Sequence, residues 1–367
     1  MRVLFYFGDR EWSGCARVIL VAARGLAGRG HPVTIACCAE SRLDALAREA
    51  GLETVSISPA SSTVGGAWDL RKVLQQRFVE VVIASTERDQ LVVSSAMRLA
   101  ERGAVLRRVP SFETLVMQRG GKLALRIAAA GPIFSTEREA QAAESHVKEW
   151  SIPPAVAPLG VDATAYDGVE AVSRRDLGVP STGVLIACTY DATGRYRIAS
   201  LFRTLALLAP RHANMHVVIF GAGSLDQDLR MHAAALGVNP VVRFLGQLED
   251  ERPVMRAADV GWVVAGGDTA AMACLDFMAL RKPVIGERSP LTQHYVADGI
   301  TGLLLASQDP SYTASRVASF LAEEDKRVAM GNAGRTRVQR DFTDVAMFDG
   351  FEHAVNAAGD RTKWTRA

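Results

Sequence analysis

The stretch DTAAMACLDFMALRKPVIGERSPLTQHYVADGITGLLL, residues 268–305, decides the fold of this chain. Two carboxylates, Asp268 and Asp276, lie eight residues apart in it. Residues 275–279 are predicted to open a short helix, and residues 281–285 lead into a buried strand. A helix followed at once by a continuous apolar strand is typical of α/β proteins with parallel sheets.

Apolar strand-like runs alternate with helix-like segments along the rest of the chain. Strands that read as continuous apolar runs belong to parallel sheets covered by helices on both faces. We therefore predict an α/β fold of two Rossmann-like domains whose parallel sheets face a central cleft. The strands predicted in the first half are residues 3–7, 33–37, 54–57, 81–84, 105–109 and 133–135. Those predicted in the second half are residues 184–187, 216–220, 241–245, 260–264, 284–286 and 302–305.

The first predicted helix has both a start signal and a stop signal. Residues 16–29 carry apolar side chains at helical spacing. Ser13 is suited to cap the N-terminus of this helix, and the Gly-Arg-Gly sequence at residues 28–30 is suited to end it.

The composition is that of an ordinary globular protein. The 367 residues are enough for two domains, and a net charge of +2 gives no general attraction to nucleic acid. The five cysteines show no paired spacing, so we expect free thiols in a reducing cytoplasm. The sequence contains no run of about 20 apolar residues, so we predict no membrane-spanning helix. The N-terminus enters a strand without the layout of a signal peptide.

The quoted stretch resembles the donor-site signature of the retaining glycosyltransferases with the GT-B fold known as family 4. Members of that family carry two glutamates separated by seven residues, an alanine-methionine-alanine helix, a proline-valine-isoleucine strand and a DG-x-TG-LL turn. Here Asp268 and Asp276 stand in place of the glutamates, residues 283–285 read Pro-Val-Ile, and residues 298–304 read DGITGLL.

The resemblance covers nearly the whole chain. It implies an acceptor-binding domain over residues 1–165, with a terminal helix at about 343–367 packing back on it, and a donor-binding domain over residues 166–342. Residues 359–367 look like a frayed tail. Further landmarks that match the family are residues 13–17, 30–35, 159–162, 217–224, 242–248 and 257–260.

The resemblance assigns roles to the two carboxylates and to the residues beside them. Asp268 corresponds to the glutamate near the sugar hydroxyls, and Asp276 to the glutamate that holds the ribose hydroxyls, for which a carboxylate is a good acceptor. Thr269, Ala270 and Ala271 precede the predicted helix, where backbone amides could meet phosphate. The alternatives are a plain strand-to-helix loop and, for Asp276, a carboxylate at a helix start.

Cations for the leaving diphosphate are expected after the first strand of the second domain. Thr189 stands where the family has an arginine. Arg195 and Arg197 lie within one residue of the position of the family's lysine, and an arginine can clamp phosphate with two hydrogen bonds. The alternative is that both are solvated surface side chains.

Loops at other strand ends complete the predicted site. Gly221 and Gly223 form a turn after a strand on the donor side, and Leu245 belongs to the next matching landmark. Ser13 and Gly14 lie in the loop after the first strand, where acceptor and sugar phosphate approach the backbone.

No metal ion or cofactor is expected besides the nucleotide sugar itself. Residues 226–228 read Asp-Gln-Asp, a spelling used by metal-dependent transferases of another fold, but here they open a helix, where aspartate is favoured anyway. The seven histidines are scattered and show no ligand spacing.

Residues 119–128 place Lys122 and Arg126 on one helical face, with Arg107 and Arg108 upstream. A basic amphipathic helix of this kind can rest on an anionic membrane, and an ordinary packed helix is the alternative. We expect a cytoplasmic protein, with peripheral contact at the inner face of the plasma membrane as a further hypothesis.

The leading hypothesis is a retaining glycosyltransferase that moves a sugar from a nucleotide diphosphate sugar to a glycan, lipid-linked or small-molecule acceptor. The mechanism implied is front-face displacement, in which the departing β-phosphate takes the acceptor proton. Two alternatives stay open. One is a non-catalytic relative that binds nucleotide or glycan, and the other is a nucleotide-sugar epimerase of the same fold.

Overall fold

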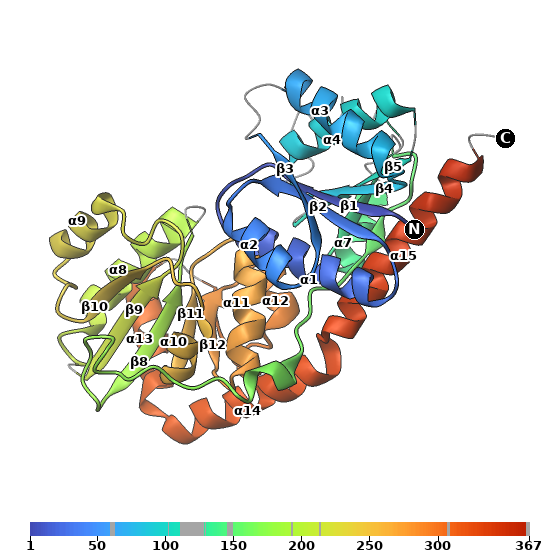
Figure 1. The fold of residues 1–367 in the computed structure, drawn as a ribbon. Helices are drawn as coiled ribbons and strands as arrows, with labels where there is room; N and C mark the ends of the chain where they lie inside the picture. The colour runs from blue at the N-terminus through green and yellow to red at the C-terminus, as the bar shows by residue number, and fades with distance from the viewer. Residues whose placement is uncertain are drawn as a thin grey trace. The chain divides into compact units, whose positions relative to one another are not determined.

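The computed structural model describes residues 1–58, 63–101, 103–110, 128, 130–144, 150–191, 194–212, 214–306 and 309–364. The chain forms two units, Met1–Leu159 with Asp344–Ala367, and Gly160–Thr343 (Figure 1). The division falls at Leu159 rather than at residue 165, because the Val161 amide already donates to the Phe342 carbonyl of the second unit at 3.0 Å.

The first unit is built on one parallel sheet. Its strands run in the order β3-β2-β1-β4-β5-β6-β7 among the described residues. They are β1 (Val3–Phe7), β2 (Val33–Cys38), β3 (Glu53–Ile57), β4 (Val81–Ala84), β5 (Ala104–Arg108), β6 (Ala130–Phe134) and β7 (Ala155–Val156). The helices are α1 (Gly14–Gly28), α2 (Arg42–Glu49), α3 (Thr63–Gln76), α4 (Glu87–Ala100), α7 (Glu137–Glu144) and α15 (Asp344–Trp364).

Helices cover both faces of this sheet, with α3 and α4 on one face and α1 and α15 on the other (Figure 1). The central strands are largely apolar, and Leu4 and Val82 are fully buried, whereas β5 ends in the buried residues Arg107 and Arg108. The predicted start and stop of the first helix are confirmed. The Ser13 hydroxyl accepts from the Ala16 amide at 3.4 Å, and α1 ends at Gly28.

The second unit holds a parallel sheet in the order β10-β9-β8-β11-β12-β13 among the described residues. Its strands are β8 (Val184–Thr189), β9 (Met215–Phe220), β10 (Val242–Gly246), β11 (Val260–Val263), β12 (Val284–Glu287) and β13 (Gly302–Leu305). Its α-helices are α8 (Arg195–Leu208), α9 (Gln227–Ala235), α10 (Arg252–Ala257), α11 (Gly267–Ala279), α12 (Pro290–Tyr295), α13 (Pro310–Ala322) and α14 (Glu324–Asp341).

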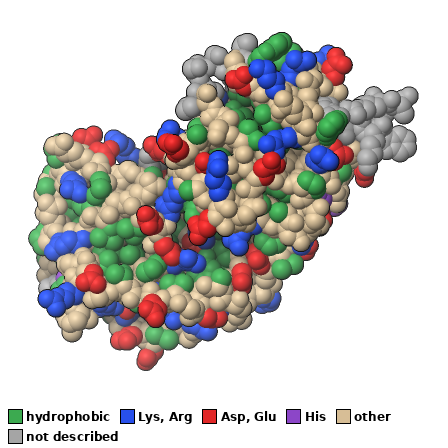
Figure 2. All heavy atoms as spheres, viewed as in Figure 1, with side chains coloured by type: hydrophobic (Ala, Val, Ile, Leu, Met, Phe, Trp, Pro, Cys, Tyr) green, Lys and Arg blue, Asp and Glu red, His purple; other side chains and the backbone are tan. Residues whose placement is uncertain are grey.

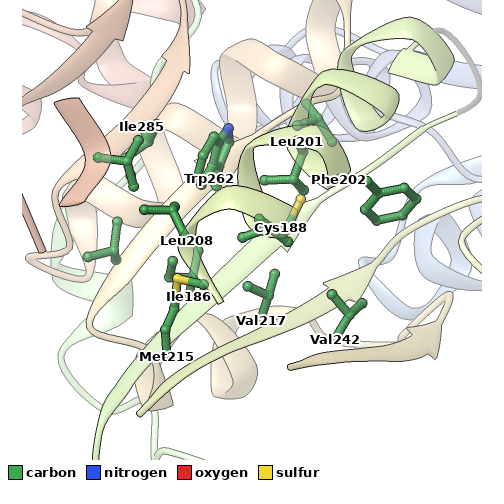
Figure 3. Close-up of a cluster of buried hydrophobic side chains, with 14 of the residues drawn as sticks. Ile186, Cys188, Leu201, Phe202, Leu208, Met215, Val217, Val242, Trp262 and Ile285 are labelled. Atoms are coloured by element: carbon green, nitrogen blue, oxygen red, sulfur yellow. The ribbon is translucent and has the colours of Figure 1, made fainter. Parts of the chain in front are cut away.

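The core of the second unit lies between this sheet and helix α8. Ile186, Val217 and Val242 project from neighbouring strands toward Leu201 and Phe202 of α8, as Figure 3 shows. All of these side chains are buried, because a parallel sheet covered on both faces leaves no strand face for water. The prediction of two Rossmann-like, parallel-sheet domains is therefore confirmed.

Two local predictions were wrong, and one strand was missed. The short strand β7 had not been predicted. Helix α11 begins at Gly267 rather than near residue 275, because residues 268–274 contain no glycine or proline that would break a helix. Helix α15 continues to Trp364, beyond the expected frayed tail at 359, because its buried face continues through Ala358 and Gly359 then packs against Met1.

The face seen in Figure 2 carries basic and acidic side chains interspersed over both units. It shows no broad basic field of the kind that binds nucleic acid. Within the described ranges, no helix is both long and apolar enough to cross a bilayer. The basic segment at residues 119–128 lies outside those ranges apart from Ala128.

In both sheets the strand order turns back beside the first strand of the unit. The turning points are β1 with β4 in the first unit and β8 with β11 in the second. The loops that leave two such strands run to opposite faces of the sheet and open a crevice at the carboxyl ends of the strands, where ligands of this fold class bind. The candidate site of the second unit is therefore sought at the ends of β8 and β11.

Candidate functional site

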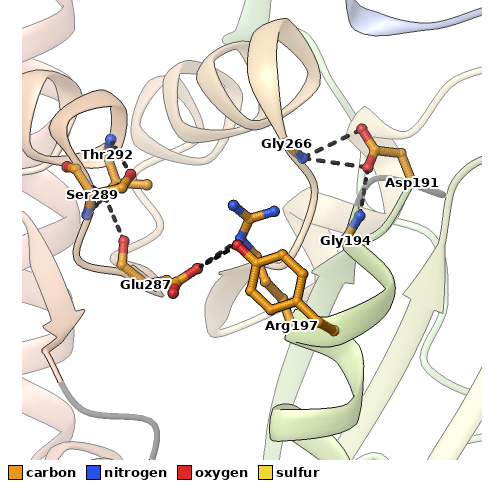
Figure 4. A network of polar contacts seen from close by, with 8 residues as sticks. Asp191, Gly194, Arg197, Gly266, Glu287, Ser289 and Thr292 are labelled. Atoms are coloured by element: carbon orange, nitrogen blue, oxygen red, sulfur yellow. Dashed lines mark hydrogen bonds and ion pairs between the residues drawn. The ribbon is translucent and has the colours of Figure 1, made fainter. Parts of the chain in front are cut away.

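The Asp191 side chain accepts hydrogen bonds from both loops at the turning point of the second sheet, the loop after β8 and the loop after β11. Its Oδ1 atom accepts hydrogen bonds from the Gly194 amide at 3.1 Å and the Gly266 amide at 3.3 Å (Figure 4). Gly194 and Gly266 are the N-cap residues of α8 and α11, so the carboxylate holds the two helix N-termini side by side. Gly194 must be glycine, because a Cβ there would lie 1.8 Å from the Val264 carbonyl oxygen.

Arg197 lies in the first turn of α8 and reaches the end of β12. Its Nε donates to Oε2 of Glu287 at 2.7 Å, and the Tyr196 hydroxyl donates to the same oxygen at 3.3 Å. Burial is the main cause that raises the pKa of Tyr196, so this hydroxyl keeps its proton at neutral pH. The side chains of Arg197 and Glu287 are 24% and 32% exposed, so the pair lies at the solvent boundary.

The loop that carries Glu287 is fixed by its own hydrogen bonds. Ser289 caps α12 through a reciprocal capping box with Thr292, and the Thr292 hydroxyl also donates to the Glu287 carbonyl (Figure 4). Beneath the ion pair lies a cavity of about 40 Å³, lined by Arg197, Glu287, Trp262 and others. Ligand pockets usually measure about 300–1,000 Å³, so this cavity by itself is too small for a nucleotide.

Arg195, the first residue of α8, pairs with the loop after β9. Its guanidinium lies 2.8 Å from Asp226 and 3.9 Å from Asp228, and its side chain is 61% exposed. Asp226 caps α9 by accepting from the Asp228 amide, which confirms that this pair of aspartates opens a helix. Exposed ion pairs contribute about 0–1 kcal/mol, so Arg195 is free to change partners.

Asp268 and Asp276 lie on the same helix, α11. Asp268 is in its first turn, where a carboxylate is favoured by the helix dipole, and is 5% exposed. Asp276 is 2% exposed and accepts a hydrogen bond from the Tyr166 hydroxyl. Eight residues of helix separate the two carboxylates by about 12 Å along the axis. Asp276 is therefore an interior residue of the helix, which excludes the alternative of a carboxylate at a helix start.

Thr269, Ala270 and Ala271 form part of the first turn of α11 rather than a loop before it. The Ala270 amide donates to the Gly266 carbonyl at 3.1 Å, so it is not available to a phosphate. Ala270 and Ala271 are both buried, which corrects the prediction that their amides meet the donor. The backbone N–H groups that have no acceptor within the helix belong to residues that precede Ala270 in the chain.

Thr189, Gly221 and Gly223 lie at the ends of two neighbouring strands. Thr189 ends β8 and is 3% exposed, and its hydroxyl has no hydrogen-bond partner among the described residues. Gly221, after β9, has a φ of 115°, and a Cβ there would lie 2.0 Å from the Tyr190 carbonyl oxygen. Only glycine fits this turn. It follows that these strand ends are packed backbone to backbone.

The structure separates other predicted residues from this group. Leu245 is half-buried on β10, which is two strands away from β8, or about 10 Å. Ser13 and Gly14 lie in the first unit, where Ser13 caps α1. The residues that the structure does bring together at the turning point are Thr189, Asp191, Arg197 and Asp268.

Sequence reasoning gave no role to Asp191, Tyr196 or Glu287. Asp191 could have been noticed as the second residue after a strand end, a place where ligand-binding side chains gather in this fold class. Glu287 gave no signal, because it ends a strand beside residues predicted only as a buried run. In the part of the chain that the structure describes, no cluster of three His, Cys, Asp or Glu side chains is arranged to hold a metal ion.

Part of the second unit, including the turning point of its sheet, matches a known protein family. Residues 171–337 match the Glycosyl transferases group 1 family. The matched stretch lies within the second unit, ends in α14 and contains Asp191, Arg197, Asp268 and Glu287.

Curated relatives of the chain are glycosyltransferases. D-inositol 3-phosphate glycosyltransferase of Corynebacterium kroppenstedtii is 26% identical over 49% of this chain and 43% of its own length. Lipopolysaccharide core biosynthesis glycosyltransferase LpsE of Rhizobium meliloti is 26% identical over 51% of this chain and 54% of its own length. Phosphatidyl-myo-inositol mannosyltransferase of Mycolicibacterium smegmatis is 30% identical over 50% and 49%. The chain thus spans about half the length of the curated relatives that it matches.

Solved structures share the fold over nearly the whole chain. Anabaena Alr3699/HepE in complex with UDP and glucose is similar with a TM-score of 0.78 and 16% identity, over 97% of this chain and all of that one. A glycosyltransferase from Rickettsia africae is similar with a TM-score of 0.75 and 14% identity, over 97% and 98%. The fold is GT-B, as predicted.

Proposed function

We propose that the protein is a glycosyltransferase that takes a sugar from a nucleoside diphosphate sugar. The observation that supports this most is the turning point of the second sheet. There two helix N-termini are held together by Asp191, with Arg197 beside them, inside the stretch that matches Glycosyl transferases group 1. Helix N-termini and arginine side chains are among the groups that bind phosphate in proteins.

The proposal of a nucleoside diphosphate sugar as donor is supported by the ligands of similar proteins and by the positions of two arginines. HepE is similar in fold and was solved with UDP-glucose as well as UDP, and one relative from Corynebacterium glutamicum is described as GDP-mannose-dependent. A nucleoside diphosphate brings negative charge to the ends of β8 and β11. Arg197 and Arg195 are the cations that we expect to meet it.

The reaction proposed is transfer with retention, by front-face displacement. The hard step is the build-up of charge on the leaving diphosphate, and fixed dipoles and cations that already face that charge lower its energy. The N-terminus of α11 and the guanidinium of Arg197 would do this. The β-phosphate would take the proton from the acceptor hydroxyl, and Asp268 would contact the sugar. No metal ion is expected to take part.

The acceptor is proposed to be a glycan or a lipid-linked or small inositol-type molecule. The relatives are described as acting on inositol phosphate, phosphatidylinositol and lipopolysaccharide core. The first unit, which includes Ser13 and Gly14 at the start of α1, is proposed to bind it. A cytoplasmic protein with peripheral contact at the membrane, through the basic residues at 119–128, fits acceptors of this kind.

The test combines binding with turnover. The purified protein is screened by thermal shift against UDP, GDP, ADP and their sugars, because a ligand of the folded state raises the melting temperature. The donor found is then incubated with inositol 3-phosphate and lipid acceptors, and the anomeric configuration of the product is read by NMR. Binding without transfer or donor hydrolysis would favour the non-catalytic alternative. Conversion of the donor sugar without release of nucleotide would favour the epimerase.

A further inference from the structure

Glu287 accepts a hydrogen bond from only one of the three guanidinium nitrogens of Arg197. The carboxylate takes only the Nε–H of the guanidinium, at 2.7 Å. The two terminal nitrogens, Nη1 and Nη2, make no hydrogen bond to any residue that the structure describes. An arginine offers five N–H donors in a rigid fork, so fixing one of them sets the direction of the other four.

We infer that Glu287, supported by Tyr196, is a positioning residue that presents the terminal nitrogens of Arg197 to the diphosphate of the donor. The inference rests on the proposed function and adds a residue to it that nothing else assigns. The position is the last residue of β12, at the edge of the sheet where β8 and β11 also end. Figure 4 shows the guanidinium lying between Glu287 and the loop at Gly266.

The support for Glu287 is itself rigid. Its carbonyl accepts from the Thr292 hydroxyl, and Thr292 is held by the capping box with Ser289. Its carboxylate receives a second hydrogen bond from the Tyr196 hydroxyl, at 3.3 Å. The centre of the Tyr196 ring also lies 4.5 Å from the Arg197 guanidinium carbon, a distance at which a cation is attracted to the face of an aromatic ring. An arginine held in this way loses less conformational entropy when it binds phosphate.

A competing interpretation predicts the opposite sign. If Glu287 were only an internal counter-ion that competes with the diphosphate, its removal would strengthen diphosphate binding, because a negative charge beside an anion weakens binding. If Glu287 positions Arg197, its removal weakens diphosphate binding even though a repulsive charge has been taken away. The direction of the change therefore separates the two roles.

The experiment measures binding of UDP, GDP and inorganic pyrophosphate by titration calorimetry, with uridine and guanosine as ligands that lack phosphate. Glu287→Ala is expected to weaken diphosphate binding about fivefold to twentyfold and to leave nucleoside binding unchanged. Glu287→Gln keeps an acceptor oxygen for Nε–H and is expected to restore most of the affinity. Arg197→Ala combined with Glu287→Ala should bind no more weakly than Arg197→Ala alone, because the two residues act as one unit.

The matched control is Glu323→Ala. Glu323 is also a carboxylate paired with a cation, Lys326 at 3.2 Å, but it follows α13 and so lies at the opposite edge of the sheet. It is expected to leave binding unchanged. Tighter or equal diphosphate binding by Glu287→Ala, or additive losses in the double variant, would overturn the positioning role alone. If wild-type protein binds no nucleoside diphosphate, the proposed function fails with it.

Discussion

Asp276 sits in the interior of α11, where the Tyr166 hydroxyl donates to it. Its resemblance to a ribose-binding carboxylate and its contact with Tyr166 are compatible, because an ionised carboxylate has about four acceptor sites. We expect Asp276→Ala to weaken UDP or GDP binding, measured by calorimetry on protein whose circular dichroism spectrum matches wild type. Unchanged affinity in such a folded variant would remove Asp276 from the site and leave it a purely structural partner of Tyr166.

Asp89 is a buried carboxylate in α4 of the first unit, 4% exposed, and it accepts from the Gly8 amide at 3.2 Å. Burial raises the pKa of Asp89 to about 6. The pKa of an aspartate in an unfolded chain is about 3.9, so Asp89 keeps its carboxyl proton to higher pH in the folded chain than in the unfolded chain. Its contribution to stability is therefore complete below about pH 4 and is lost as the pH rises through about 6.

Asp89→Asn removes this ionisation and keeps an oxygen for the Gly8 amide. The variant is expected to be about 2–3 kcal/mol more stable than wild type at pH 8, with the difference vanishing near pH 4. Urea unfolding of both proteins from pH 4 to pH 8 measures this. A difference that stays constant over that range would show that Asp89 does not change its protonation on folding.

The link that Asp191 makes between α8 and α11 belongs to the geometry of secondary-structure elements. Asp191→Ala is expected to lower the free energy of unfolding by about 1–2 kcal/mol, because two helix-cap amides lose their acceptor. It should also weaken nucleotide binding, since the two helix N-termini would no longer be held together. Asp191→Asn keeps Oδ1 and is the control. Equal urea midpoints for Asp191→Ala and wild type would show that the loops hold their places without it.

Most strands of both sheets could be predicted, because they are largely apolar runs typical of buried parallel strands, whereas the two-residue strand β7 is too short to give such a run. The start of α11 was placed too late, although Gly266 and Gly267 are turn residues that could have marked the end of the preceding loop. The contact between Arg197 and Glu287 could not be predicted from the sequence. The two residues are 90 positions apart, as Asp191 and Gly266 are 75 apart, and only the folded sheet brings each pair together.

Metal dependence is a property of the intact protein, and we expect none. The leaving charge is proposed to be met by the α11 N-terminus and by Arg197, which need no metal ion. Transfer, or slow donor hydrolysis, is measured on metal-stripped protein with and without excess EDTA. A loss of activity that magnesium or manganese restores would contradict this. Asp226 and Asp228, whose carboxylates pair with Arg195, would then be the candidate metal ligands.

The second unit is one unbroken segment inserted into the first. Its two ends meet, since the Val161 amide donates to the Phe342 carbonyl and a Cβ on Gly160 would lie 2.0 Å from the Thr343 carbonyl oxygen. The first unit is completed only by α15, where Arg29 of the first segment pairs with Glu352 at 2.7 Å. During synthesis the inserted unit is therefore complete before the unit that began first, because the sheet of the first unit is made long before the helix that covers it.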